Sequence, residues 1–295
     1  MRRALLIGAN GFLGRHVGQV LLAHGWWVRP TSRTDTPGHV RVDLSPEGSG
    51  ALTAVITEYR PHAVINCAGA VSGDTAELVA ANTTGPAVLV RAMWDSASDA
   101  RLVHLGSAAE YGIGTPGAPI TESHLPRPVG IYGVSKLAGT QAVELGRAAG
   151  LDAVVLRVFN PVGTGAPPDS LPGRLVGEFA RAPAEIKLGP LAAVRDFVDA
   201  RDVADAVLAA ITAPTVGMPV LNVAGGRGVP VRTLVDMLAG IAGFAGTITE
   251  SADGSPRSAA VSWQEADISR IERVLGWRPK FELHTSLEEL WRTAR

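Results

Sequence analysis

The most informative part of the sequence for the fold is the run Leu5-Leu6-Ile7-Gly8-Ala9-Asn10-Gly11-Phe12-Leu13-Gly14. An apolar run that suits a buried strand leads through three glycines into a segment with the periodicity of an amphipathic helix. Gly8 permits a tight turn, Gly11 lets the backbone approach a pyrophosphate, and Gly14 lets the helix pack closely on the strand. The amino end of that helix offers unpaired N–H groups to the anion. The turn therefore predicts a dinucleotide site formed by Gly8, Asn10, Gly11, Phe12, Leu13 and Gly14.

Beyond this turn, short β-rich runs alternate with longer helical stretches. Strands are expected near residues 3–7, 26–31, 63–67, 101–106 and 153–158, and helices near 12–24, 50–60, 75–97 and 132–149. Such alternation indicates a parallel sheet with helices on both faces. Several strands are apolar throughout, as expected when both faces of a sheet are buried. The predicted fold class is α/β, a doubly wound parallel Rossmann sheet with a smaller C-terminal substrate lobe.

Prolines break up the chain after about residue 160, at positions 161, 167, 168, 172, 183 and 190. A helix is expected near 171–181 among these loops, whereas a helix near 200–212 and a strand near 219–223 are expected to return to the first sheet. This predicts a dinucleotide-binding domain of residues 1–164 and 199–224, with a substrate lobe of residues 165–198 and 225–295. The lobe would cover the carboxyl edge of the sheet, where open α/β sheets bind their ligands.

The composition narrows the class of protein. The 295 residues carry a formal net charge of −1, which gives no electrostatic reason to expect nucleic acid or an anionic membrane as a partner. The single cysteine, Cys67, excludes a cysteine-based metal site and is expected as a small buried residue in a strand. The histidines show no metal spacing. The apolar run after Met1 is too short for a signal peptide, and no apolar stretch approaches the ~20 residues that span a bilayer. We therefore expect a soluble cytoplasmic protein without a metal.

A tyrosine and a lysine are spaced for catalysis in the run Tyr132-Gly133-Val134-Ser135-Lys136. Only three of the 27 lysine and arginine residues are lysines, and Lys136 is one of them. A lysine at this position is therefore notable in a sequence that otherwise uses arginine. Residues four apart share one helix face, and both side chains can reach one cleft. The ammonium would favour the phenolate and lower a tyrosine pKa from about 10. A Tyr-Lys pair on a solvated helix face is the alternative.

The end of the second strand predicts the cofactor. An acidic residue there would bind the ribose 2′-hydroxyl of NAD, whereas a basic residue accommodates the 2′-phosphate of NADP. The sequence has Ser32 and Arg33 at this place, and no carboxylate follows until Asp35. NADP(H) is therefore favoured and NAD(H) remains possible, because Arg33 could also be a solvated loop residue.

Taken together, these features resemble the extended short-chain dehydrogenase/reductase family, the NAD-dependent epimerase/dehydratase group, over essentially the whole chain. Six further motifs carry the resemblance, namely Val42-Asp43-Leu44, Cys67-Ala68-Gly69-Ala70, Asn82-Thr83-Thr84-Gly85, Leu105-Gly106-Ser107-Ala108-Ala109-Glu110-Tyr111-Gly112, Phe159-Asn160-Pro161-Val162-Gly163 and Val194-Arg195-Asp196-Phe197. The resemblance implies that Ser107, Tyr132 and Lys136 are catalytic and that Tyr132 and Lys136 also touch the cofactor. It adds Asp43, Leu44, Ala68, Gly69, Ala70 and Asn82 to the cofactor site.

The resemblance also implies a substrate site that would hold a nucleotide-linked sugar. Asn160 would touch the sugar beside the nicotinamide, and Arg195 and Arg257 would clamp the diphosphate, which two guanidinium groups can neutralise through paired hydrogen bonds. Either arginine could instead be a surface residue. Glu110 is placed with the substrate residues because it follows Ser107 closely, and capping of a loop is its alternative role. A homodimer through the helices near 75–97 and 132–149 is also expected from the family.

Three reactions of the group are possible: 4,6-dehydration, 4-epimerisation and reduction of a 4-keto sugar. Dehydration is disfavoured because Ala108 and Ala109 stand where dehydratases of the family carry an Asp-Glu pair. Reduction of a 4-keto-6-deoxyhexose by NADPH, with Tyr132 as proton donor, is favoured by Ser32-Arg33 and by local resemblance to GDP-6-deoxy-4-keto-mannose reductases. The run Phe159–Gly163 resembles UDP-galactose 4-epimerases, so NAD-dependent epimerisation stays open. Reduction of a ketone or aldehyde without a nucleotide also stays open, as does binding of the dinucleotide without catalysis, although the complete Ser-Tyr-Lys set argues against the latter.

Overall fold

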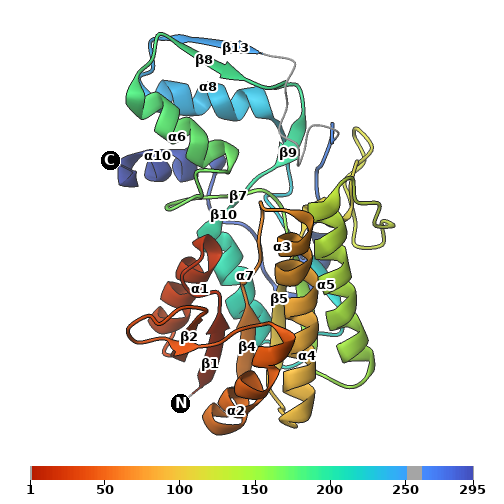
Figure 1. Ribbon diagram of the computed structural model, residues 1–295. Coiled ribbons are helices and arrows are strands. Elements are labelled where there is room, and N and C mark those ends of the chain that lie inside the picture. The colour runs from red at the N-terminus through yellow and green to blue at the C-terminus, as the bar shows by residue number, and fades with distance from the viewer. Residues whose placement is uncertain (1, 251–260, 295) are drawn as a thin grey trace.

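The computed structural model describes residues 2–250 and 261–294. At its centre lies a seven-stranded sheet with the order β11-β6-β5-β4-β1-β2-β3, in which all neighbours are parallel (Figure 1). The strands are β1 (Arg3–Ile7), β2 (Trp27–Ser32), β3 (Val40–Arg41), β4 (Ala63–Asn66), β5 (Arg101–Ser107), β6 (Ala153–Val158) and β11 (Val220–Val223). The chain order reverses between β1 and β4, and a reversal of this kind opens a crevice at the carboxyl edge of the sheet. The predicted fold class is confirmed.

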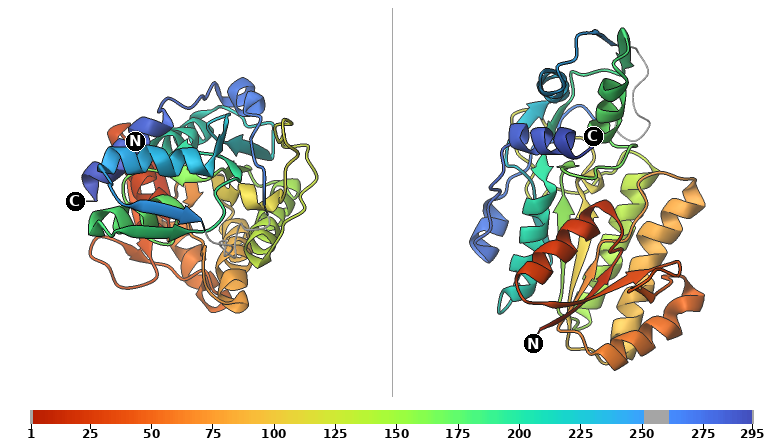
Figure 2. Two further views of the ribbon diagram at one scale, coloured as in Figure 1. Left: turned by 90° about the horizontal axis from the view of Figure 1, so that it is seen from above. Right: turned by 90° about the vertical axis from the view of Figure 1, so that its left-hand side faces the viewer.

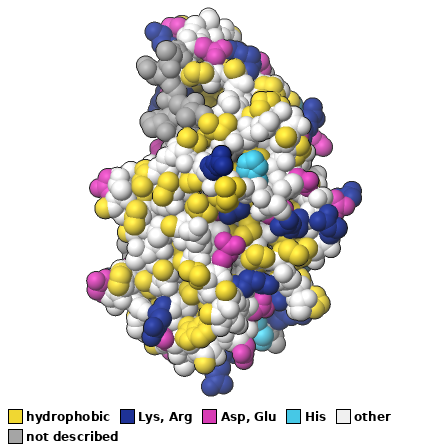
Figure 3. Space-filling model, turned by 90° about the vertical axis from the view of Figure 1, so that its right-hand side faces the viewer, with side chains coloured by type: hydrophobic (Ala, Val, Ile, Leu, Met, Phe, Trp, Pro, Cys, Tyr) yellow, Lys and Arg dark blue, Asp and Glu magenta, His cyan; other side chains and the backbone are white. Residues whose placement is uncertain are grey.

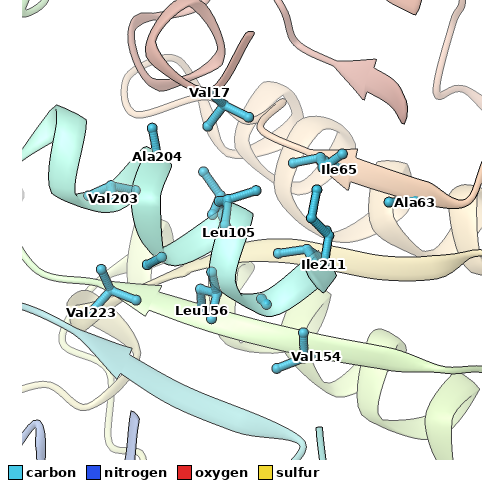
Figure 4. Close-up of a cluster of buried hydrophobic side chains, with 14 of the residues drawn as sticks. Val17, Ala63, Ile65, Leu105, Val154, Leu156, Val203, Ala204, Ile211 and Val223 are labelled. Atoms are coloured by element: carbon cyan, nitrogen blue, oxygen red, sulfur yellow. The ribbon is translucent and has the colours of Figure 1, made fainter. Parts of the chain in front are cut away.

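Helices cover both faces of this sheet (Figure 2). One face packs on α1 (Phe12–Ala23), α7 (Ala200–Thr212) and α9 (Ser269–Leu275). The other packs on α2 (Ser49–Tyr59), α4 (Gly85–Asp95) and α5 (Ile131–Ala148). In the first layer, aliphatic side chains from α1 and α7 interdigitate with those of β1, β4, β5, β6 and β11. Figure 4 shows Val17, Ile65, Leu105 and Leu156 among them. The rigid sheet that results holds the carboxyl ends of β1, β4, β5 and β6 in fixed positions.

The predicted helix near 75–97 is divided into three parts. It consists of α3 (Thr75–Val79), a π-helical turn η2 (Ala80–Thr84) and α4. Asp74 caps α3, with its side chain accepting from the Glu77 N–H and the Glu77 carboxylate accepting from the Asp74 N–H. The π-helical turn widens the backbone where Asn82 is buried, and such turns are frequent at functional sites. Two further short turns are η1 (Pro46–Gly48) and η3 (Ala108–Glu110).

A smaller unit lies above the carboxyl edge of the sheet (Figure 1). It contains α6 (Leu171–Arg181), α8 (Val231–Ala242) and α10 (Leu283–Thr293), together with β8 (Glu185–Leu188) paired in parallel with β13 (Thr247–Glu250). These elements share an apolar core of their own, centred on buried leucines such as Leu175, Leu234 and Leu287. Two short ladders connect this unit to the sheet: β7 (Pro161–Val162) with β10 (Val198–Asp199), and β9 (Val194–Asp196) with β12 (Gly228–Pro230).

The predicted bounds differ from the structure at a few places. Cys67 lies one residue beyond β4 and is partly rather than fully buried. Helix α9 belongs to the region predicted as lobe but packs on α7 and the sheet, with Ile271 and Trp277 in the sheet's own core.

Within residues 2–250 and 261–294, no helix combines the length and apolarity needed to cross a membrane.

Candidate active site

The glycine turn after β1 is built for close backbone approach. Gly8 has φ +75°, and a Cβ added to it would lie 2.6 Å from the Ala68 nitrogen of the neighbouring strand end. A Cβ on Gly14 would lie 2.1 Å from the Gly8 carbonyl oxygen, so α1 touches the turn directly. Gly11 is the N-cap of α1 and provides no side chain to cap its first turn. Backbone walls beside a helix amino end fit the pyrophosphate of a dinucleotide.

The loop after β4 forms the opposite wall of the crevice. Asn66 Oδ1 accepts from the Ala68 N–H at 3.0 Å. Asn82 Oδ1 accepts from the Ala70 N–H at 2.9 Å, and its Nδ2 donates to the Ala70 carbonyl at 2.8 Å. A Cβ on Gly69 would lie 2.9 Å from Asn82 Oδ1. Asn82 is 1% exposed, so it shapes the loop after β4 from behind.

The residues predicted for the adenosine end lie together at the carboxyl ends of β2 and β3. Ser32 ends β2, and its hydroxyl accepts from the Thr36 hydroxyl at 3.0 Å. Arg33 is exposed beside it. Asp43 follows β3 and is exposed, with its carboxylate accepting from the N–H and hydroxyl of Ser45. Leu44 packs against Gly85 at the start of α4.

The three predicted catalytic residues converge from two elements. Ser107 is the last residue of β5, and Tyr132 and Lys136 lie on the first turns of α5. Tyr132 Oη donates to Ser107 Oγ over 3.4 Å. Lys136 is 6% exposed, and its Nζ donates to the Leu105 carbonyl at 2.6 Å. Burial lowers the pKa of Lys136, while the nearby Glu110 carboxylate opposes that effect. Hydroxyl, phenol and ammonium thus meet at the carboxyl edge of the sheet, next to the loop after β4.

Glu110 was predicted to contact the substrate, but in the structure its side chain contacts other residues of the protein instead. Its side chain is fully buried, Oε1 accepts from the Ser107 N–H at 2.7 Å, and Oε2 pairs with Arg157 Nε at 2.7 Å. Both carboxylate oxygens are therefore engaged within the protein. Glu110 caps the turn that follows Ser107 because η3 directs its side chain back toward the strand end. We call residues 107–112 the Ser107 turn.

The predicted substrate residues lie between the sheet and the smaller unit. Asn160 has φ +20°, and its Nδ2 donates to the Asp196 carbonyl at 2.7 Å. Arg195 is 6% exposed and donates to the carbonyls of Val194 and Val261 at 2.8 and 2.6 Å. Burial lowers the pKa of Arg195 to about 10. Arg257 lies outside the described residues.

A loop joins the two sides of the crevice. His16 of α1 makes a 2.9 Å hydrogen bond to the Thr164 carbonyl. Five residues later, Asp169 accepts from the Ser72 hydroxyl at 3.1 Å, and Ser72 belongs to the loop after β4. The segment 164–169 therefore crosses from α1 to the opposite wall, above the point where the strand order reverses.

Comparison with known proteins settles the family. The model of the NAD dependent epimerase/dehydratase family matches residues 4–224. The chain belongs to this family. The resemblance inferred from the sequence motifs is thereby confirmed.

Individual relatives agree with the epimerase/dehydratase assignment. A dTDP-6-deoxy-L-talose 4-dehydrogenase (NAD(P)(+)) of Kitasatospora kifunensis is 38% identical over 304 residues, covering 98% of this chain and 94% of the relative. The structure of RMD from Pseudomonas aeruginosa complexed with NADPH superposes with a TM-score of 0.86 at 25% identity, covering 99% of this chain and 98% of that one. MoeE5 in complex with UDP-glucuronic acid and NAD gives a TM-score of 0.87 at 26% identity, covering 100% and 99%.

Three side chains at this epimerase/dehydratase site were not predicted. Arg157 could have been identified from the sequence, because a charged residue inside an apolar strand requires a buried partner. Arg41 lies opposite Ser32 in the pairing of β2 with β3, a register that a two-residue strand does not reveal. Gln264 contacts the Ser107 turn from 156 residues away, and no local pattern in the sequence announces that contact.

Proposed function

We propose that this chain is an enzyme that interconverts ketone and alcohol at C4 of a nucleotide-linked 6-deoxyhexose with NADP(H), working mainly as a 4-keto reductase. The observation that carries the proposal is the convergence of Ser107 Oγ and Tyr132 Oη, 3.4 Å apart, with the buried Lys136 ammonium at the same strand edge. A phenol can protonate the alkoxide that develops in carbonyl reduction, a hydroxyl can stabilise it, and an ammonium can stabilise the phenolate that remains. The glycine turn beside them fits the dinucleotide.

The roles of the three side chains follow from their chemistry. The bound cofactor supplies the hydride that forms the new C–H bond at C4. Tyr132 donates its proton to the carbonyl oxygen as negative charge develops there, and Ser107 donates a hydrogen bond to the same oxygen. Lys136 then stabilises the phenolate that Tyr132 becomes. Because burial lowers the pKa of Lys136, this residue is also a readier proton source for restoring the phenol.

The substrate class draws support from the relatives and from one buried arginine. The Kitasatospora relative is named for 4-dehydrogenation of a dTDP-linked 6-deoxyhexose, which is the reverse of the proposed reduction. Arg195 is buried among backbone carbonyls at the junction of the sheet and the smaller unit. We propose that phosphate oxygens of the nucleotide replace these carbonyls and that Arg257 joins it there. A phosphate oxygen carries the negative charge that a carbonyl oxygen lacks, so the exchange adds an ionic interaction and allows paired hydrogen bonds to the guanidinium.

The NADP(H) preference is proposed from two guanidinium groups. Arg33 follows β2, and Arg41 lies opposite Ser32 in the adjoining strand. Both side chains are exposed at the end of the crevice where the adenosine ribose would lie. Replacing both with alanine is expected to raise the KM for NADPH at least 10-fold and to leave the KM for NADH nearly unchanged. Equal effects on the two cofactors would refute this role.

The activity test begins with the cofactor that the purified protein retains. Denatured protein is analysed for released nicotinamide, and emptied protein is titrated with NADPH and NADH. An empty site that prefers NADPH supports reduction, and tightly held NAD supports 4-epimerisation, the alternative favoured by epimerase relatives such as the UDP-glucose 4-epimerase of Rhizobium meliloti. Oxidation of NADPH is then followed with dTDP-linked 4-keto-6-deoxyhexoses and with the free sugars.

A matched pair of tyrosine variants tests the mechanism. Tyr132→Phe should abolish turnover and leave NADPH affinity nearly intact, because only the proton donor is lost. Tyr59→Phe is the control, since the Tyr59 hydroxyl donates to the Trp27 carbonyl at 2.8 Å, away from the crevice. Turnover by Tyr132→Phe at the wild-type rate would refute the assignment of Tyr132.

We further propose that the enzyme is a cytoplasmic homodimer that pairs through α3, α4 and α5. Large apolar side chains are exposed along these helices, including Trp94 at 50%, Val134 at 47% and Leu145 at 71%. Figure 3 views this side of the molecule, where hydrophobic side chains are grouped across the middle. Leu145→Glu should shift the mass measured by light scattering from dimer to monomer. The control Leu22→Glu changes an exposed leucine of α1 and should leave the dimer intact.

A further inference from the structure

A ribbon of the C-terminal region runs alongside the Ser107 turn. On one side, residues 261–267 hydrogen-bond the segment that follows the turn, with the Trp263 carbonyl accepting from Gly114 N–H and the Glu265 carbonyl accepting from Ile120 N–H. On the other side, the Val194 N–H donates to the Ser262 carbonyl at 2.9 Å. The ribbon is therefore fixed between β9 and the catalytic end of β5.

Gln264 connects this ribbon to the turn itself. Its side chain is 4% exposed, and Nε2 donates to the carbonyls of Ala108 at 3.0 Å and Gly112 at 2.8 Å. These carbonyls lie at the two ends of the Ser107 turn, so one amide group joins both ends. A primary amide has two N–H donors on one nitrogen, and both are used here.

Other contacts of the turn come from other directions. Glu110 holds the Ser107 N–H and is held in turn by Arg157. The Tyr111 hydroxyl donates to Asn222 Oδ1 at 2.7 Å. Gln264 reaches the turn from the ribbon of residues 261–267. In the same ribbon, the Val261 carbonyl accepts a hydrogen bond from the Arg195 guanidinium. The nucleotide side and the catalytic serine thus share one short segment of chain.

We propose that Gln264 is a positioning residue that fixes the Ser107 turn for proton transfer; its effect on turnover rests on the function proposed above. Without the amide, the buried Gly112 carbonyl loses its side-chain donor, the Ala108 carbonyl keeps only the Tyr111 N–H, and the turn can shift. The Ser107 Oγ to Tyr132 Oη separation of 3.4 Å then changes with it. Misplacement of a catalytic group by about 1 Å can cost 10²-fold in rate.

The kinetic test is a double-mutant cycle. Gln264→Leu keeps the bulk of the side chain and removes both donors, and it should lower kcat by about 10- to 100-fold with NADPH affinity unchanged. Gln19→Leu, at an exposed position of α1, is the control and should keep wild-type kcat. In a Ser107→Ala background the Gln264→Leu change should have little further effect on kcat, because Gln264 acts through that serine. An equal loss in both backgrounds would overturn the proposal.

A second variant tests the same role if the leucine protein folds poorly. Glutamate at this position, Gln264→Glu, cannot donate while ionised but recovers one donor when protonated. The ratio of variant to wild-type kcat should therefore rise as the pH falls. A ratio that does not depend on pH would contradict the proposed donor role.

Hydrogen exchange separates this proposal from the proposed function. In the NADPH-bound protein, Gln264→Leu should speed exchange of backbone amides in residues 107–114, whereas Gln19→Leu should not. Faster exchange in a protein that reduces no nucleotide-linked 4-keto sugar would refute the proposed substrate and support the positioning role. Unchanged exchange would refute the positioning role for any substrate.

Discussion

The ion pair between Glu110 and Arg157 predicts a specific pattern of stability changes. The side chains are 0% and 4% exposed, and Oε2 lies 2.7 Å from Nε. Removing one partner leaves the other charge buried and uncompensated, which costs about 3–5 kcal/mol. Both Glu110→Leu and Arg157→Met should therefore lower the unfolding free energy by about this amount. The larger effect is expected for Glu110→Leu, because an arginine cannot escape its charge by changing protonation.

The double variant Glu110→Leu with Arg157→Met should be more stable than Glu110→Leu alone. Apolar side chains of similar volume need no compensation for lost hydration, so the principal remaining cost is the Ser107 N–H that loses its acceptor. An unsatisfied buried donor costs about 1–3 kcal/mol. The double variant should thus lose about 1–3 kcal/mol, and its turnover should stay low because the Ser107 turn has lost its cap.

Urea denaturation of the four proteins, with kcat measured in parallel, checks this reasoning. The control is Asp95→Asn, which breaks an ion pair of the same 2.7 Å length on the surface of α4. Exposed pairs contribute little, so that change should scarcely alter the unfolding free energy. If the two single losses simply add in the double variant, the account of Glu110 and Arg157 as one buried unit is refuted.

Three further predictions follow from single contacts. Gly14→Ala places a Cβ against the Gly8 carbonyl and should cost about 1–3 kcal/mol and weaken NADPH binding in a fluorescence titration. The control Gly177→Ala, at an exposed position of α6, should stabilise by about 0.5–1 kcal/mol. Burial and the Lys136 charge lower the pKa of His104 well below 6.5, so the stability this residue contributes is present above pH 6.5 and is lost as the pH falls, by at most about 1.4 kcal/mol per pH unit. The difference in unfolding free energy between the wild type and His104→Gln should therefore shrink from pH 7 to 5, a comparison in which other titrating groups such as Asp196 cancel. Arg101→Met removes charge-assisted hydrogen bonds to carbonyls at the end of α7 and should lower the unfolding free energy by about 1.5–3 kcal/mol in urea.

Much of the sheet could be predicted because its strands are strong local signals. The runs around Val64 and Val154 are apolar on both faces, and a parallel sheet covered by helices requires that pattern. The glycine turn could be predicted for the same reason, because each glycine meets a local steric requirement of the turn. By contrast, β3 has two residues and no measurable periodicity, and the π-helical turn at Asn82 leaves the helical pattern of its neighbours nearly unchanged.

The site could be predicted less completely because its geometry depends on distant contacts. The sequence places Glu110 near Ser107, but only the direction of η3 shows that the carboxylate turns back to the Ser107 N–H. Gln264 reaches the turn from a ribbon whose position is set by β9. Arg195 could be named from a motif, whereas its burial among carbonyls is a product of the tertiary packing. The chemical groups of the site could be identified from the sequence, whereas the hydrogen-bonding partners of each group could not be predicted.

The position of Cys67 has a practical consequence for spectroscopy. The thiol is partly buried at the start of the loop after β4, and burial raises its pKa to about 12, against a smaller opposing effect of Lys136. The thiolate is the form that reacts with maleimides, and almost none is present at neutral pH. Because this is the chain's single cysteine, we expect the native protein to react only slowly with maleimides. A cysteine introduced on the segment 164–169 could carry a fluorophore without first removing Cys67, and motion of that loop could be followed in an otherwise unmodified protein.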